Sequence, residues 1–160
     1  MPEEVIERAL RSPDDTARLA KALAPHLRSG DVILLSGGLG VGKTYLSREI
    51  LHALGLPRTE EVLSPTFLLL QSYALPKMRV LHADFYRLRD AVNPENEVRR
   101  LGLEEALEEG ALLLLEWGDD FEIAGDHALR IQLDRTGDSE EQRRVTLSGR
   151  LARSVDGFER

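Results

Sequence analysis

The chain has 160 residues, a formal net charge of -7 and no cysteine. Its length suits one domain with a substantial core, and the lack of cysteine excludes disulfides, thiolate metal sites and a cysteine nucleophile. So acidic a chain is not expected to bind nucleic acid through a broad basic surface. The opening MPEEVIERAL is acidic where a signal peptide is basic and then apolar, and no apolar run is long enough to span a bilayer. We therefore expect a cytoplasmic protein that does not contact a membrane.

The first third of the chain predicts a helix, a buried strand and a second helix. Residues 14–28 carry leucines at every fourth position, which is typical of a helix, although Pro25 should kink it. Residues 31–35 read DVILL and predict a buried strand. Residues 46–54 show a second apolar helical stripe, which Gly55 should end.

The rest of the chain predicts two hairpins around a central strand. The strand-like runs 67–75 and 78–85 are joined only by Pro76-Lys77, and so short a link forces an antiparallel hairpin. Residues 111–115 are apolar at every position, which suits a central strand covered on both faces. The other predicted elements are a helix that begins at Asn93-Pro94, a short helix over 103–109 and a second hairpin with strands around 129–133 and 145–147.

Glycines crowd the segment between the first strand and the second helix, which reads GGLGVGKT. The spacing Gly37-x4-Gly42-Lys43-Thr44 matches the P-loop (Walker A) pattern in the strand-loop-helix context that the pattern requires. In such a loop, backbone N–H groups turn inward around a phosphate, Lys43 reaches the β and γ oxygens, and Thr44 offers its hydroxyl to Mg²⁺. We expect Lys43 to face solvent until phosphate arrives. The predicted phosphate-binding residues are Gly38, Leu39, Gly40, Val41, Gly42, Lys43 and Thr44.

A glycine-rich turn can also exist for packing alone, but the Lys-Thr pair in register favours nucleotide binding. The elements and the motif together predict the α/β class, as a P-loop NTPase three-layer sandwich whose mixed, mainly parallel central sheet carries antiparallel hairpins. No repeat or linker interrupts the sequence. We therefore expect one domain over residues 1–160, with 151–160 as a flexible tail.

Two predicted strands end in an acid, at Asp84 and at Glu116. Phosphoryl transfer needs a metal held against the phosphates and a group that orients the attacking oxygen. Because Glu116 follows the more apolar strand, we assign Glu116 to Mg²⁺ and Asp84 to orienting water or supporting the metal; the reverse assignment stays open, as does a carboxylate that only caps or ion-pairs. His82 shares a strand face with Asp84 and can touch the site, although a structural histidine is the favoured interpretation. The predicted catalytic residues are Lys43, Asp84 and Glu116, and the predicted metal ligands are Thr44, Glu116 and Asp84.

After the P-loop, the chain carries SPTF at 64–67, HADFYR at 82–87 and Glu116-Trp117. In this order these motifs resemble the bacterial TsaE (YjeE) family of small P-loop ATPases, over residues from about 10 to about 135. The resemblance implies ATP and Mg²⁺ as cofactors and a role in threonylcarbamoyl transfer to the adenosine next to the anticodon of tRNA. It further implies that TsaB and TsaD are partners, that ATP hydrolysis resets TsaD between rounds, and that tRNA is contacted only through the complex.

The resemblance also implies roles for single residues. Thr16 would lie near the nucleotide base, and Trp117 would pack beside the nucleotide. Residues 64–67 would form a switch-like loop in which Thr66 senses the γ-phosphate. Aromatic residues at strand ends are, without the resemblance, more often core packing than ligand contacts.

This chain departs from the family pattern at two positions, because Gly38 stands where family loops carry an acid and Tyr45 stands where they carry a second threonine. Two other functions stay open: a nucleotide-dependent adaptor without turnover of its own, and a small-molecule kinase. A kinase would need lid arginines, for which Arg87, Arg89, Arg99 and Arg100 are available. A regulatory GTPase is not expected, because no Asn-Lys-x-Asp guanine-binding motif is present.

Overall fold

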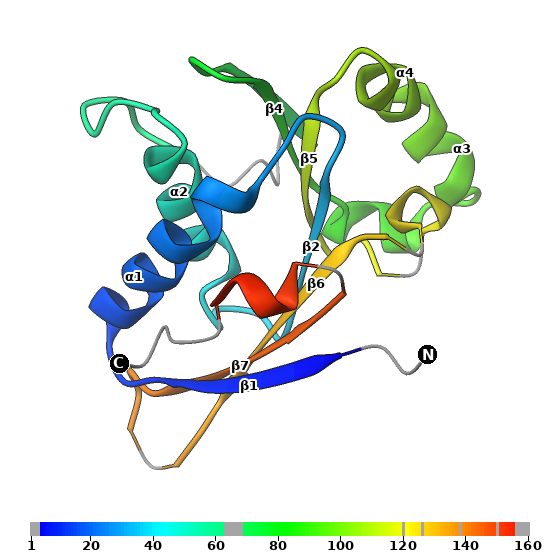
Figure 1. Cartoon of the computed structure of the whole chain (residues 1–160). Coiled ribbons are helices and arrows are strands. Elements are labelled where there is room, and N and C mark those ends of the chain that lie inside the picture. The colour runs from blue at the N-terminus through cyan, green and yellow to red at the C-terminus, as the bar shows by residue number, and fades with distance from the viewer. Residues whose placement is uncertain are drawn as a thin grey trace.

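A seven-stranded mixed sheet forms the centre of the protein, with strand order β1-β7-β6-β2-β5-β4-β3 (Figure 1). The computed structural model describes residues 4–62, 69–119, 121–125, 127–137, 139–149 and 151–155. The strands are β1 (Val5–Leu10), β2 (Val32–Ser36), β3 (Leu70–Ala74), β4 (Arg79–Asp84), β5 (Leu112–Glu116), β6 (Leu129–Arg135) and β7 (Arg143–Ser148). The strands β6, β2, β5 and β4 run parallel, whereas β3–β4, β6–β7 and β1–β7 are antiparallel pairs. The predicted α/β class, with a mixed sheet and two hairpins, is confirmed.

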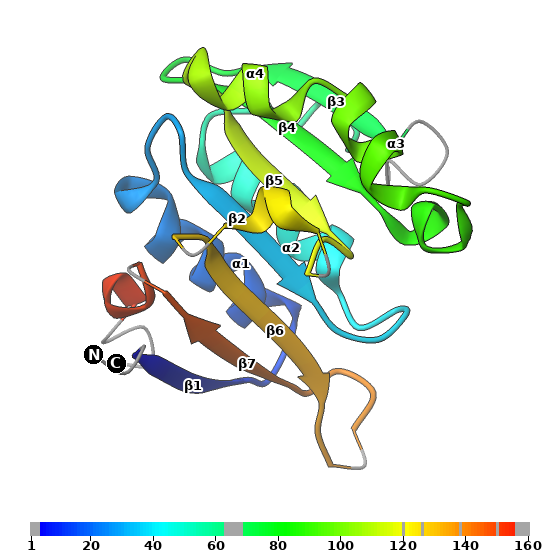
Figure 2. The same ribbon diagram turned by 90° about the vertical axis from the view of Figure 1, so that its right-hand side faces the viewer.

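Helices cover both faces of the sheet (Figures 1 and 2). The α-helices are α1 (Pro13–Leu23), α2 (Lys43–Ala53), α3 (Pro94–Arg100) and α4 (Leu103–Glu108), and the 3-10 helices are η1 (Ala24–His26), η2 (Tyr86–Asp90), η3 (Glu122–Ala124) and η4 (Ala152–Val155). The helices α1 and α2 lie on one face, and α3 and α4 lie on the other. None of the helices in the described part of the chain is both long enough and apolar enough to cross a bilayer.

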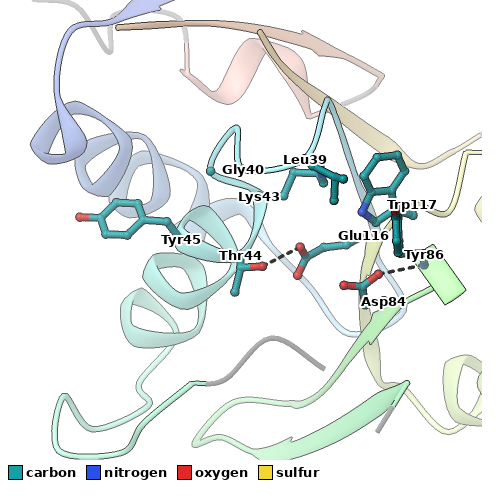
Figure 3. Close-up of a pocket in the computed structure, with 10 residues that line it drawn as sticks. Leu39, Gly40, Lys43, Thr44, Tyr45, Asp84, Tyr86, Glu116 and Trp117 are labelled. Carbon is teal, nitrogen blue, oxygen red and sulfur yellow. Dashed lines mark hydrogen bonds between the residues drawn. The ribbon is translucent and has the colours of Figure 1, made fainter. Parts of the chain in front are cut away.

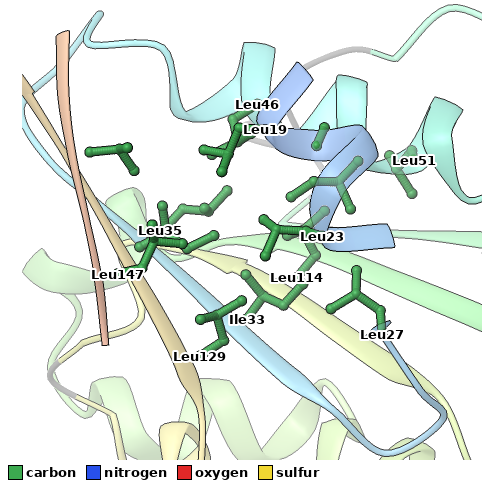
Figure 4. Close-up of a cluster of buried hydrophobic side chains, with 14 of the residues drawn as sticks. Leu19, Leu23, Leu27, Ile33, Leu35, Leu46, Leu51, Leu114, Leu129 and Leu147 are labelled. Atoms are coloured by element: carbon green, nitrogen blue, oxygen red, sulfur yellow. The ribbon is translucent and has the colours of Figure 1, made fainter. Parts of the chain in front are cut away.

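The strand β5 is buried on both faces, which explains why each of its positions is apolar before Glu116. Because side chains alternate along a strand, Leu112 and Leu114 pack beneath α1 and α2, whereas Leu113 and Leu115 pack beneath α3 and α4. Figure 4 shows the first of these two clusters, in which the leucines of α1 and α2 meet those of β2, β5, β6 and β7. This double packing holds the carboxyl end of β5, where Glu116 lies, at the centre of the molecule.

The end of α1 and the segments near the two ends of the chain differ from the predictions. No element is predicted for Val5–Leu10, yet this segment forms the edge strand β1 against β7. The first helix ends at Leu23, because Pro25 falls in the 3-10 helix η1. Near the other end, the 3-10 helix η4 buries Ala152 and Val155, whereas residues 156–160 of the expected tail lie outside the described residues. The predicted strand start at residue 67 lies outside the described residues, and β3 is described from Leu70.

Candidate nucleotide-binding site

The loop between β2 and α2 adopts backbone conformations that require glycine at two positions. Gly37 has φ 138°, and a Cβ at this position would lie 2.4 Å from the backbone oxygen of Leu133. Gly42 has φ 116° and caps the N-terminus of α2 in the left-handed region. Gly38, in contrast, has no atom within 4 Å of a Cβ position. The family-atypical Gly38 is therefore not required by the packing of the loop.

Lys43 does not face solvent, so that expectation is wrong. Its side chain is only 5% exposed, and Nζ donates hydrogen bonds of 2.7 Å to the carbonyl oxygens of Gly37 and Gly38. The ammonium group also lies 4.2 Å from the ring centroid of Trp117. The loop folds around Lys43 because its carbonyls and the indole face all attract a cation.

Burial of the ammonium group lowers the pKa of Lys43 from its ordinary value. The negative charges of Glu116, Asp84 and Asp119 oppose this shift, in that order of size. Lys43 is therefore a buried cation among three carboxylates, at a position from which it can meet an added anion.

Glu116 joins the phosphate-binding loop to the sheet. Its Oε1 accepts a hydrogen bond of 2.9 Å from Thr44 Oγ1, and its Oε2 lies 2.5 Å from Nε2 of His82. Ser47 Oγ lies 3.4 Å from the same Oε2 and donates at 3.0 Å to the Lys43 carbonyl. The carboxylate, at 2% exposure, is thus held on both oxygens.

Asp84 lies beside Glu116, because the two residues are register partners at the carboxyl ends of the parallel strands β4 and β5. Register partners point to the same face of a sheet, so both carboxylates lie on the side of α2. Asp84 Oδ1 accepts a hydrogen bond of 2.9 Å from the backbone N–H of Tyr86 (Figure 3). The two acids that the sequence singles out therefore stand next to each other.

His82 contacts the Glu116 carboxylate directly. It is fully buried on β4, and its Nδ1 has no hydrogen-bond partner among the described residues. The expected structural histidine is thus also the neighbour of the predicted metal ligand. Its contact fixes the position of the Glu116 carboxylate.

Most of the predicted phosphate and metal residues line one open cavity of about 330 Å³ (Figure 3), whereas Gly38 and Val41 are not among its lining residues. The cavity is lined by Leu39, Gly40, Gly42, Lys43, Thr44, Tyr45, Asp84, Tyr86, Glu116 and Trp117. A cation, a hydroxyl and two carboxylates thus converge at the N-terminus of α2, where the helix dipole favours an anion.

Tyr86 and Trp117 form an aromatic part of the lining of this cavity, and Arg89 packs against their rings. The rings of Tyr86 and Trp117 meet edge to face with their centroids 5.0 Å apart, and the guanidinium of Arg89 lies 4.1 Å from the Tyr86 centroid. Trp117 holds φ at 61°, an uncommon value for a residue with a bulky side chain. The structure thus places Trp117 at the cavity and against Lys43.

A second cavity of about 210 Å³ lies next to the first and shares Gly42 and Tyr45 with it. It contains the predicted Thr16, which lies on α1. The second cavity is lined by Pro13, Thr16, Val41, Gly42, Tyr45, Leu133, Glu140, Glu141 and Arg143. Burial raises the pKa of the Tyr45 hydroxyl, as does the charge of Glu49. The Tyr45 hydroxyl group lies 3.4 Å from the Pro13 carbonyl oxygen, so this contact links α2 to the start of α1.

Three features of the site are not predicted from the sequence. Asp119 accepts a short hydrogen bond from Ser36 at the end of β2 and adds negative charge near Lys43. Ser47 approaches Glu116 from the next turn of α2. The β6–β7 hairpin contributes arginines beside the loop. Only Asp119 has a signal in the sequence, as an acid three residues after Glu116. Thr66 and residues 64–67 lie outside the described residues.

The donors in the first cavity fit Mg²⁺ bound together with phosphate. Mg²⁺ is usually held by one or two carboxylates, a hydroxyl, waters and substrate phosphates rather than by a cage of protein ligands. The side chains of Thr44, Glu116 and Asp84 supply this type of oxygen. Within the described ranges, no group of three His, Asp or Glu side chains could hold a metal without such help.

The sequence and the fold are similar to those of known proteins. A family model described as threonylcarbamoyl adenosine biosynthesis protein TsaE matches residues 10–145. The chain is 46% identical to the tRNA threonylcarbamoyladenosine biosynthesis protein TsaE of Rickettsia bellii over 110 residues, covering 69% of this chain and 72% of the relative. It is 33% identical to that of Bacillus subtilis over 139 residues, covering 86% and 83%. The fold is similar to the crystal structure of Bacillus subtilis YdiB, with a TM-score of 0.75 and 25% identity over 99% of this chain and 97% of that chain.

Proposed function

Because the chain belongs to the TsaE family of tRNA threonylcarbamoyladenosine biosynthesis proteins, we propose that it is an ATPase of that pathway. The chain binds ATP with Mg²⁺ in the first cavity and hydrolyses it to ADP and phosphate. The family membership supports the pathway, and the geometry of the cavity supports the chemistry.

One observation carries the proposal: the hydrogen bond of 2.9 Å from Thr44 Oγ1 to Glu116 Oε1, beside Lys43. It brings the hydroxyl and the carboxylate that Mg²⁺ prefers to the positive end of a helix, within the same cavity as a cation for phosphate oxygens. A turn that served packing alone would not need a buried lysine and two buried acids at this place.

Thr44 and Glu116 would hold Mg²⁺, and Asp84 would orient the attacking water or support the metal. The metal, when bound, would neutralise charge on the β- and γ-phosphates. Lys43 would leave the carbonyls of Gly37 and Gly38 for the phosphate oxygens. This exchange favours binding, because a buried ammonium gains full negative charges in place of carbonyl dipoles.

The base of the nucleotide would enter the second cavity. Thr16 is buried there on α1, and Tyr45 separates it from the first cavity. The shared wall at Gly42 and Tyr45 makes the two cavities neighbours, as a base and its phosphates require.

The proposed partners are TsaB and TsaD, with tRNA contacted only through the complex. The net charge of -7 supports an indirect contact with tRNA, because counterion release offers little affinity to an acidic chain. Hydrolysis would reset the complex between rounds of threonylcarbamoyl transfer to the adenosine next to the anticodon.

Calorimetry and phosphate release test the proposal. The isolated chain should bind ATP more tightly with Mg²⁺ than with a chelator, and phosphate release should rise when TsaB and TsaD are added. Absence of ATP binding under both conditions would exclude the proposed function.

A nucleotide-dependent adaptor is the second candidate, favoured by the open first cavity. The cavity is open, so water-excluding groups would have to come from a partner. Binding of ATP without phosphate release in the complete complex would identify an adaptor, and transfer of phosphate to an acceptor would identify a kinase.

A further inference from the structure

The β6–β7 hairpin lies against the outer side of the phosphate-binding loop. The strands β2 and β6 are parallel neighbours, and Ser36 at the end of β2 is in register with Gln132. Their carboxyl ends lie at the same edge of the sheet as the β6–β7 connection (Figure 2). Gly37 packs so closely on β6 that a Cβ there would meet the Leu133 oxygen. The loop and the hairpin are therefore in direct contact.

Two arginines of the hairpin donate to consecutive carbonyls of the loop. Arg143 Nε donates a hydrogen bond of 2.8 Å to the Val41 oxygen, and Arg135 Nη2 donates one of 3.1 Å to the Gly40 oxygen. Arg143 is half-buried, whereas Arg135 is exposed. The bond from Arg143 is shorter and better shielded from water, so it should stabilise the loop more.

Arg143 is itself fixed by the hairpin turn. Its Nη1 donates to the backbone oxygens of Glu140 at 2.5 Å and of Gln142 at 2.9 Å. The planar guanidinium thus joins the turn to the Val41 carbonyl in one geometry. It also lines the second cavity, opposite Thr16 and Tyr45.

Holding a carbonyl also orients the N–H group of the same peptide bond. No cis peptide occurs in the described part of the chain, so the C=O and N–H of each loop peptide point in opposite directions. The Val41 oxygen faces Arg143, which turns the Gly42 N–H away from the hairpin. The Gly40 oxygen faces Arg135, which turns the Val41 N–H away from the hairpin, and without nucleotide this N–H lies 3.4 Å from the Gly38 oxygen within the loop. A P-loop needs N–H groups with this inward direction around the phosphate.

The hydrogen bonds of the two arginines and of Lys43 to the loop should respond differently when phosphate binds. Lys43 must release the Gly37 and Gly38 carbonyls in order to reach a phosphate. The bonds from Arg135 and Arg143 lie on the other side of the loop and need not break. These two arginines can therefore support the loop with and without nucleotide.

We propose that Arg143, assisted by Arg135, is a positioning residue that directs the N–H groups of Val41 and Gly42 toward the phosphates of the nucleotide. This inference rests on the proposed nucleotide binding. Because the loop surrounds the β-phosphate, loss of Arg143 should weaken ADP and ATP binding alike.

The test compares Arg143→Met with Arg144→Met. Arg144 is the next residue on β7, is exposed, and points to the opposite face of the sheet. Arg144→Met is therefore a matched control, because it removes the same charge from the other face. By calorimetry, Arg143→Met should raise the Kd for ADP about tenfold, which is the loss of one charge-assisted hydrogen bond. Arg144→Met should keep the wild-type Kd. Arg143→Lys keeps a charged donor and should lie between wild type and Arg143→Met.

A second measurement needs no nucleotide. The ¹⁵N order parameters of Val41 and Gly42 should be about 0.85 in the wild type and Arg144→Met, and should fall toward about 0.6 in Arg143→Met. Arg143→Lys provides the same comparison if the methionine variant does not fold.

The outcomes separate the inference from the proposed function. If wild type and all variants fail to bind both ATP and ADP, the proposed function is excluded, and the order parameters alone decide whether Arg143 holds the loop. Order parameters in Arg143→Met equal to those in Arg144→Met would overturn the inference. It would also be overturned if the loop became mobile but ADP affinity stayed at the wild-type value.

Discussion

Thr44 and Glu116 meet across 72 residues of sequence, with Thr44 Oγ1 donating to Glu116 Oε1 at 2.9 Å. This contact links the start of α2 to the end of the central strand β5. It therefore fixes where a metal bound by both residues would lie, between the helix terminus and the sheet.

The first prediction separates the two acids of the cavity. Glu116→Gln should abolish the Mg²⁺-dependent gain in ATP affinity, because an amide oxygen is a poorer ligand for a hard cation than a carboxylate. Asp84→Asn should leave ATP binding nearly unchanged and lower turnover in the complete complex about a hundredfold. Calorimetry with and without Mg²⁺, together with phosphate release, measures both. The opposite pattern would exchange the two roles.

The second prediction concerns Lys43. Lys43→Ala should weaken ATP binding about tenfold to a hundredfold, which corresponds to losing a hydrogen bond from a charged group. The fold should survive, because the variant also removes a buried charge that is costly to desolvate. Calorimetry reports the affinity, and thermal unfolding is the control. Wild-type affinity in Lys43→Ala would contradict its role as a phosphate ligand.

The third prediction compares two neighbouring glycines with the same substitution. Gly37→Ala should destabilise the protein and weaken nucleotide binding, because a Cβ would lie 2.4 Å from the Leu133 oxygen at φ 138°. The expected loss is about 1–3 kcal/mol, as for other residues forced into sparsely populated backbone regions. Gly38→Ala should be nearly neutral, because no atom lies within 4 Å of its Cβ position. Urea unfolding of both variants provides the comparison, and equal stability losses would refute it.

The fourth prediction uses Trp117, which is the only tryptophan in the sequence. Its ring centroid lies 4.2 Å from the Lys43 ammonium. If Lys43 moves to a phosphate when ATP binds, the fluorescence emission of Trp117 should change. A titration that follows this emission should give the same Kd for ATP as calorimetry. Without nucleotide, Lys43→Ala should already differ from wild type in its emission spectrum. Identical spectra of the two proteins would show that the contact is absent in solution.

The fifth prediction concerns alkaline stability through Tyr73. Burial raises the pKa of this phenol above its ordinary 10.0, with a further contribution from the charge of Glu60. The folded state therefore binds the phenolic proton more tightly than the unfolded state. The resulting stabilisation is complete below pH 10.0 and is lost as the pH rises through the higher folded-state pKa. Urea unfolding should show a steeper alkaline loss in wild type than in Tyr73→Phe, and equal slopes would contradict the assignment.

Local patterns predicted most of the fold. The strand β5 was predictable because it is apolar at every position, and the β3–β4 hairpin because two residues leave room only for a reversal. The strand β1 was not predictable, because its segment VIERAL pairs with one strand only and buries only Ile6 and Leu10 strongly. An edge strand leaves a weak pattern, since half of its surroundings are solvent.

In the candidate site, too, residues with a local sequence pattern were predictable, and residues that meet only in the folded chain were not. The loop residues through Thr44 are contiguous, so one motif reveals them, and the two acids are marked by their place after apolar strands. Arg143 meets the loop only after the strands have assembled, and no motif near it in the sequence indicates the contact. The burial of Lys43 was missed for the same reason, because it depends on Trp117 from the end of β5.

The pairing of β1 with β7 also has a consequence for synthesis on the ribosome. Val5–Leu10 emerges from the ribosome well before its ladder partner in the described sheet, Arg143–Ser148. Chains grow and fold from the N-terminus, so β1 must wait, unpaired, until β7 has been made. A nascent chain that stops before Arg143 would leave Ile6 and Leu10 uncovered and one edge of β6 open. Incomplete chains of this protein should therefore be prone to join one another through that edge, whereas in the folded sheet β7 pairs with β6 there and β1 pairs with the other side of β7.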